Sequence, residues 1–189
     1  MHFTLTTALL LAAAGTGLAA PTTSQAAEVP AGLQILRVDP QPDGGVITWY
    51  GDSATEGTTP NEEANPAVIN KRCGSNQIEC HTSHLAWYSN CLALTVNLND
   101  NQGTMPTSPR SVCLAGPISY LEAMPCCISW SKDAPGARKS HFYNAAFDTY
   151  NSCRDWQYGG YRVSGKSKDT NINGVCLTQC LSGRPDGCN

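Results

Sequence analysis

The amino-acid sequence predicts an α+β fold, a small disulfide-rich domain in which two helices pack on an antiparallel sheet, preceded by a β-hairpin segment. Three observations lead to this prediction. All ten cysteines lie between Cys73 and Cys188, two segments repeat apolar residues with helical period, and several short runs alternate apolar and polar residues. Charged residues make up only 14% of the chain, so we expect disulfides to supply much of the stability.

The first 20 residues predict a secretory signal peptide. An apolar run from Ala8 to Ala14 is followed by small residues, with cleavage expected near residues 19–27. The run is too short to cross a bilayer, and no second such segment follows it. We therefore expect a soluble, secreted extracellular protein with no membrane span.

Residues 28–72 form an acidic block that we interpret as a propeptide-like hairpin and linker. Two β-prone runs, Leu33–Val38 and Val46–Tyr50, are joined by a turn-rich connector that contains Gly44 and Gly45. An isolated hairpin is marginally stable in water. We therefore expect it either to extend the sheet of the downstream domain or to be a transient part of a precursor.

The linker ends in Lys71-Arg72, directly before the first cysteine. A dibasic pair in an exposed linker is typical of the sites that subtilisin-type proteases of the late secretory pathway cleave. The alternative is a solvated dibasic pair with no role in processing. Both interpretations remain open from the sequence.

Residues 73–189 form the cysteine-rich domain. The even number of cysteines in a secreted chain predicts that all of them form disulfides, although spacing leaves the pairing open. Cys126 and Cys127 are not expected to bond to each other, because adjacent residues cannot reach relaxed disulfide geometry. The expected participants are Cys73, Cys80, Cys91, Cys113, Cys126, Cys127, Cys153, Cys176, Cys180 and Cys188.

Two helices are predicted in this domain. The first begins after Thr82 or Ser83, either of which can cap it, and ends at residues 99–103. The second begins at Ser140 and ends at Cys153. The first helix carries two neighbouring apolar stripes, Leu85, Tyr88, Leu92 and Val96 on one and Trp87, Cys91, Leu94 and Leu98 on the other.

Alternating residues predict strands between and after the helices. Cys126–Ser131 is expected to be a central strand. Tyr161–Ser164 and a run near Ile172–Leu177 supply two more, separated by the polar stretch Gly165–Thr170. The tail from Cys180 to Cys188 contains a Pro-Asp-Gly turn that a disulfide can close at both ends.

Several of these segments resemble a fungal family of small secreted cysteine-rich proteins labelled WD-like, over nearly all of residues 73–188. The resemblance implies fungal origin and secretion, without a β-propeller and without a particular chemistry. A looser resemblance in layout, to fungal and viral killer toxins, implies a toxin-like role. The family resemblance is carried by residues 72–76 (RCGSN), 108–113 (SPRSVC), 126–131 (CCISWS) and 174–188 (GVCLTQCLSGRPDGC), and by His84 with Cys91.

No set of side chains predicts catalysis, a metal site or a cofactor. His81 and His84 have a spacing that can place two imidazoles together, but two ligands do not make a site, and capping or surface roles explain them better. The chain contains the residue types of a small ribonuclease site, a histidine, carboxylates and arginines, but their spacing in the sequence does not bring them together. These residues are His141, Glu79, Glu122, Arg110 and Arg162.

The best candidate binding patch is Trp156, Tyr158, Tyr161 and Arg162. These residues lie in a glycine-rich segment after a predicted helix end, where exposed aromatic rings often bind ligands. The alternative is a loop whose rings fold back onto the sheet.

These observations favour a secreted, non-enzymatic, cysteine-rich protein, effector-like or killer-toxin-like, that binds an extracellular target. The target is expected to be a cell-surface protein or a glycan, and the protein to be a monomer. A net charge of −3 gives no electrostatic case for nucleic acid. The alternatives are a small secreted hydrolase such as a ribonuclease, and a carbohydrate-binding module.

Overall fold

A computed structural model describes residues 29–53, 73–99, 104–116 and 124–188. The predicted signal peptide and the Lys71-Arg72 pair lie outside these residues. In the described part of the chain, no helix is both long and apolar enough to span a membrane.

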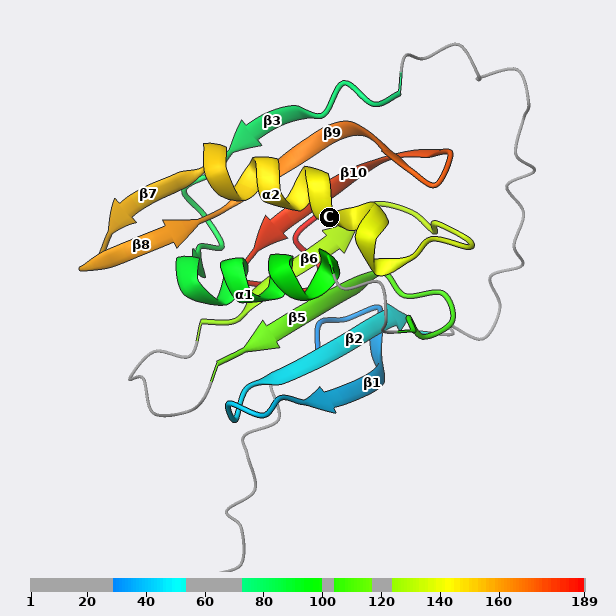
Figure 1. The fold of residues 1–189 in the computed structure, drawn as a ribbon, viewed down its shortest axis with the longest axis horizontal. Coiled ribbons are helices and arrows are strands. Elements are labelled where there is room, and N and C mark those ends of the chain that lie inside the picture. Colours follow the sequence, from blue (N-terminus) through cyan, green and yellow to red (C-terminus); the bar gives the residue numbers. More distant parts are fainter. Residues whose placement is uncertain (1–28, 54–72, 100–103, 117–123, 189) are drawn as a thin grey trace, which may run out of the picture.

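The described residues form two antiparallel sheets and two short α-helices (Figure 1). The larger sheet has the strand order β1-β2-β5-β6-β10-β9-β3, and the smaller sheet has the order β4-β8-β7. The strands are β1 (Leu33–Pro40), β2 (Val46–Asp52), β3 (Gln77–Cys80), β4 (Ala86–Trp87), β5 (Ser111–Ala115), β6 (Cys126–Trp130), β7 (Arg154–Gln157), β8 (Gly160–Val163), β9 (Gly165–Ile172) and β10 (Val175–Ser182). The helices are α1 (Tyr88–Asn99) and α2 (Tyr143–Ser152), with a 3-10 helix, η2 (Lys139–Phe142), leading into α2.

The predicted α+β class, with two helices on an antiparallel sheet as its main feature, is wrong. Ten described strands and only two short helices make a mostly β protein. The main difference is β9: the sequence predicts the polar stretch 165–170 as a connection between strands, whereas in the structure it is part of a strand. In the structure Ser167 and Thr170 are buried, and β9 pairs with a strand on each side. Pairing and burial thus override the weak strand propensity of this stretch.

The predicted run near residues 172–177 is two strands joined by a tight turn. Asn173 and Gly174 have φ angles of 51° and 86°, the left-handed conformation that a two-residue hairpin requires. The turn connects β9 to β10, and β10 continues to Ser182. The first residues of the tail, Cys180 to Ser182, are therefore part of a strand.

Helix α1 begins later than predicted and buries one of its two apolar stripes. The short strand β4 occupies positions where the first turn of the helix was expected, so the helix begins at Tyr88 and not directly after Thr82 or Ser83. Cys91, Leu94, Thr95 and Leu98 are buried, whereas Leu92 and Val96 are exposed. The helix contacts β5 and β6, and α2 contacts β9 and β10.

The N-terminal hairpin belongs to the larger sheet. Strand β2 pairs with β5, and β1 forms the edge (Figure 1). Trp49 of β2 is only 1% exposed and belongs to the main core cluster. Its indole nitrogen donates a hydrogen bond to Asp39 Oδ2 at 3.0 Å, and the charged groups of Arg37 and Lys139 lie 5.3 and 5.8 Å from its ring centre. The hairpin thus supplies a central core residue.

Four disulfides join elements of the fold. They are Cys80–Cys153, Cys91–Cys126, Cys113–Cys127 and Cys180–Cys188. Successive side chains of a strand point to opposite faces, so Cys126 reaches α1 while Cys127 bonds its register partner on β5. The expectation that these adjacent cysteines do not bond to each other is confirmed.

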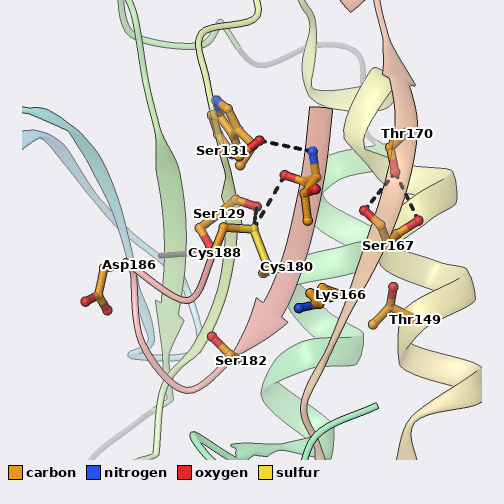
Figure 2. Close-up of a disulfide and its surroundings, with 12 residues drawn as sticks. Ser129, Ser131, Thr149, Lys166, Ser167, Thr170, Cys180, Ser182, Asp186 and Cys188 are labelled. Carbon is orange, nitrogen blue, oxygen red and sulfur yellow. Dashed lines mark hydrogen bonds between the residues drawn. A yellow bond between two sulfur atoms is a disulfide. The ribbon is translucent and has the colours of Figure 1, made fainter. Parts of the chain in front are cut away.

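The predicted closure of the C-terminal tail is also confirmed. Figure 2 shows the Cys180–Cys188 disulfide, which folds the tail back beside β6 and β10. The Cys188 Sγ lies 3.4 Å from the carbonyl oxygen of Ser129 and 3.5 Å from that of Thr178. The tail therefore contacts two strands of the larger sheet.

Candidate functional site

The β7–β8 hairpin extends at one end of the molecule (Figure 1). Its two turn residues, Tyr158 and Gly159, have φ angles of 50° and 76°. Positive φ at both central positions is the pattern of a type I′ turn, which matches the twist of paired strands. The segment predicted as a glycine-rich loop is thus a tight hairpin of fixed register.

Three aromatic rings of this hairpin are exposed, and we call them the aromatic patch: Trp156, Tyr158 and Tyr161. Their exposed fractions are 61%, 82% and 47%. Trp156 and Tyr161 are register partners, so they lie on the same face of the hairpin. Their rings meet edge to face with centroids 4.9 Å apart. The alternative, a loop whose rings fold back onto the sheet, does not describe these exposed rings of a hairpin.

The aromatic patch continues into a series of rings on the helices. Tyr161 lies 5.8 Å from Tyr88 at the start of α1, and Tyr88 stacks on Tyr150 of α2 at 4.5 Å. Along α2, Phe147 lies 6.3 Å from Tyr150 and 5.4 Å from Tyr143. Tyr161, and Trp156 through its contact with Tyr161, therefore pack against an aromatic layer, which limits the freedom of these two rings before any ligand binds.

Arg154 joins the hairpin to this layer. Its guanidinium lies 5.3 Å from the ring centres of both Tyr88 and Tyr161, and its Nη1 donates a hydrogen bond to Tyr88 Oη at 3.0 Å. Hydrogen bonds with Tyr150 and Arg154 lower the pKa of Tyr88, whereas burial raises the pKa of Tyr150. The charge of Arg154 thus lies beside the hydroxyl group of Tyr88 and beside the rings of Tyr88 and Tyr161.

Arg162, which we predicted to be part of the patch, lies on the other face of the hairpin and is fully buried. Its guanidinium carbon is 3.3 Å from the ring centre of its register partner Trp87. A Cβ added to Gly160 would lie 2.6 Å from the Trp87 ring and 2.7 Å from Arg162 Nη1. Arg162 therefore packs against Trp87 on the buried face of the hairpin and does not contribute to the exposed face.

Tyr88 and Arg154 were not predicted as part of the site. Arg154 is two residues before Trp156 and alternation places both on one face, so strand periodicity could have identified it. Tyr88 lies 66 residues away from Arg154 in the chain. No local sequence pattern predicts this contact between Tyr88 and Arg154.

The ribonuclease-like set is not assembled as an active site. Glu79 forms salt bridges with Lys166, at 3.3 Å, and with Lys168, and the hydrogen bond from Lys168 lowers the pKa of Glu79. His141 Nδ1 accepts a hydrogen bond from the backbone N–H of Arg138, and Arg110 pairs with Asp52 at 2.7 Å. Glu122 lies outside the described residues. Each of the described members thus has a different partner.

His81 and His84 are both exposed. Within residues 29–53, 73–99, 104–116 and 124–188, no group of three or more His, Cys, Asp or Glu side chains is placed to hold a metal ion. A small cleft beside Arg110, Trp130 and Asp186 has a volume of ≈ 20 Å³. It has room for about one water, which is far below the size of a small-molecule site.

The two sheets, the four disulfides and the exposed hairpin define a small cysteine-rich β protein, and the disulfides are consistent with secretion. The sequence matches the model of the Fungal WD-like family over residues 56–188. The chain therefore belongs to this family, and the resemblance noted from the sequence is confirmed. No curated protein and no solved structure gives a match. The β1–β2 hairpin precedes the residues that match the family.

Proposed function

We propose that this protein is a secreted, non-enzymatic binding protein that recognises an extracellular target with its aromatic patch, in an effector-like or toxin-like role. Its family and its four disulfides are compatible with a small secreted cysteine-rich protein. The observation that carries the proposal is the conformation and exposure of Tyr158.

Tyr158 occupies a turn position that suits asparagine or glycine. Its positive φ costs a non-glycine residue about 1–2 kcal/mol. Its ring is 82% exposed, so packing within the fold returns little of that cost. A bulky side chain held in an unfavourable conformation without internal contacts is typical of a functional position, and a ligand that covers the ring would supply the missing contacts.

The other two rings of the patch make the surface suitable for binding. Trp156 and Tyr161 present large apolar faces, and such residues dominate the binding energy of many interfaces. Because the Tyr161 ring lies between Tyr88 and Arg154, Tyr161 and its neighbour Trp156 lose little conformational entropy when they bind. These two rings are thus largely organised before they meet a target.

A glycan is the target class that we favour, which makes a carbohydrate-binding role the second candidate function. Asp155 and Gln157 alternate with Trp156 along β7, so their side chains leave the other face of this strand, and Gln157 Nε2 donates a hydrogen bond to Asp155 Oδ2 at 2.9 Å. Carboxylate and amide groups can exchange hydrogen bonds with sugar hydroxyls, and the neighbouring ring faces can cover the apolar faces of sugar rings. A cell-surface protein remains the alternative target.

A sedimentation assay with insoluble chitin and β-glucan tests the proposal, alongside intact fungal cells before and after surface proteolysis. We expect Trp156→Ala to weaken binding at least tenfold. Val96→Ala on α1 is the matched control, because it removes exposed apolar surface outside the patch. Binding to the polysaccharides supports a glycan target, and binding lost on proteolysis indicates a protein target. Equal binding by both variants would overturn the proposal.

A further inference from the structure

Two cysteines have no disulfide partner in the structure. Cys73 and Cys176 are both partly exposed thiols, and the remaining eight of the ten cysteines of the chain are joined in four disulfides. The only unused intramolecular partner for each thiol is therefore the other. Both lie outside the aromatic patch and play no part in the function proposed above.

The fold brings these two thiols together from distant parts of the sequence. The backbone N–H of Gly74 donates a hydrogen bond to the carbonyl oxygen of Asp169 at 2.5 Å, which holds the segment before β3 beside β9. A Cβ on Gly74 would lie 3.9 Å from the Cβ of Asn171, and Asn171 is the register partner of Cys176. Cys73 and Cys176 thus flank the same residue and share a hydrogen bond.

The chemistry of the pair disfavours other roles for the thiols. Burial, followed by the hydrogen bond with Cys176, raises the pKa of Cys73 to about 11, so only a small fraction of Cys73 is thiolate at physiological pH, which disfavours a role as a catalytic nucleophile. A structural metal site needs further ligands. In the described part of the chain these cysteines belong to no group of three metal-binding side chains.

We propose that Cys73 and Cys176 form a fifth disulfide when the protein passes through an oxidising compartment. The oxidant is a disulfide, either small or carried by an oxidoreductase, that reacts by thiol–disulfide exchange. The first protein thiolate attacks it and releases one thiol, and the second protein thiolate displaces the other from the mixed disulfide. The two protein thiols together lose two protons and two electrons, and the oxidant disulfide is reduced to two thiols.

This bridge ties the start of the cysteine-rich domain to the β9–β10 turn. In Figure 1 that turn lies at the end of the molecule opposite the β7–β8 hairpin. The loop that it closes, from Cys73 to Cys176, encloses three of the four other bridges. Closing a loop of this length restricts the unfolded chain more than any of the bridges inside it.

Non-reducing tryptic mapping of the secreted protein tests the proposal, after denaturation with N-ethylmaleimide at acidic pH to prevent exchange. Trypsin cleaves the backbone after Lys168 and leaves residues 169–189 as one peptide, which contains Cys176, Cys180 and Cys188 and no other cysteine. The same digestion produces residues 73–110, which contain Cys73. A fifth disulfide joins these two peptides, and no cysteine carries maleimide.

Two variants test whether the link between the peptides involves Cys176. In Cys176→Ser we expect peptide 169–189 to be released alone and Cys73 to carry one maleimide per molecule. Val175→Ser is the matched control, because it changes the neighbouring residue of β10 and keeps the thiol, and we expect the wild-type map. Release of peptide 169–189 from the wild-type protein with maleimide on Cys176, or a link from Cys176 to any other cysteine, would overturn the proposal.

Discussion

Arg162 lies directly across the β4–β8 ladder from Trp87, with its guanidinium carbon 3.3 Å from the centre of the indole ring. This contact is on the buried face of the hairpin whose opposite face carries Trp156 and Tyr161. The two faces have different roles, because one holds the hairpin in place and the other is exposed for binding. Substitutions on the two faces are therefore expected to separate stability from binding.

Substitution of Arg162 should lower stability. Arg162→Ala removes a desolvated cation–π contact and leaves a cavity, for which we expect a loss of about 2–4 kcal/mol in the free energy of unfolding. Arg162→Lys keeps the charge but not the planar group, so we expect a smaller loss. Urea denaturation measures both values. A loss below about 0.5 kcal/mol for Arg162→Ala would contradict the supporting role assigned to this residue.

Gly160 should tolerate no side chain. In Gly160→Ala the new methyl group would lie within 2.7 Å of both the Trp87 ring and Arg162 Nη1, so we expect a loss of about 1–3 kcal/mol from overpacking. Gly74→Ala is a useful comparison, because its Cβ meets no atom closer than 3.9 Å and its cost arises from its φ of 99°. Thermal unfolding measures both losses of stability. Near-ultraviolet circular dichroism distinguishes the two variants, since only Gly160→Ala should change the signal of Trp87.

The N-terminal hairpin should be required for the stability of the whole fold. Trp49→Ala removes a fully buried indole from the main core, so we expect a loss of about 3–5 kcal/mol. If a protease cleaves after Arg72, we expect the hairpin to remain bound through β2 and β5. Because the first 72 residues contain no cysteine, native size-exclusion chromatography should then show one species and a denaturing, non-reducing gel two. Two species under native conditions would show that the hairpin leaves.

The salt bridges of Glu79 should make stability depend on acidic pH. Lys168 and Lys166 lower the pKa of Glu79 in the folded protein, so the group contributes stability above its unfolded pKa of about 4.3 and loses it as the pH falls through the lower folded value. We expect the wild type to unfold at a higher temperature than Glu79→Gln at pH 6, with the difference vanishing near pH 2. Salt should reduce the difference. A difference that does not depend on pH would contradict this assignment.

Local patterns predicted the parts of the fold that local chemistry determines. The alternation around Cys126 and Cys127 identified the middle strand of the larger sheet, and the helical period of the apolar residues between Ser140 and Cys153 identified α2. The burial of Ser167 and Thr170 could not be predicted, because it follows from the pairing of β9 with β10 on one side and with β3, a distant segment of the chain, on the other. This difference explains why the fold class was wrong while several elements were located correctly.

The candidate site was likewise predicted only in part from local sequence patterns. The exposed rings were found from their glycine-rich context, but Arg162 was assigned to the wrong face, because a shift of one position along a strand moves a side chain to the other side of a sheet. The support from Tyr88 depends on the packing of α1 against the hairpin. No short motif encodes that contact.

The most direct test of the central claim is a comparison of Tyr158→Asn with the wild type in both stability and target binding. Asparagine suits the positive φ of this turn position, so we expect the variant to be more stable by about 0.5–1 kcal/mol. The same variant lacks the exposed ring, so we expect its affinity for the target that the wild type binds to fall at least tenfold. Higher stability with unchanged affinity would contradict the claim that the aromatic patch is the binding surface.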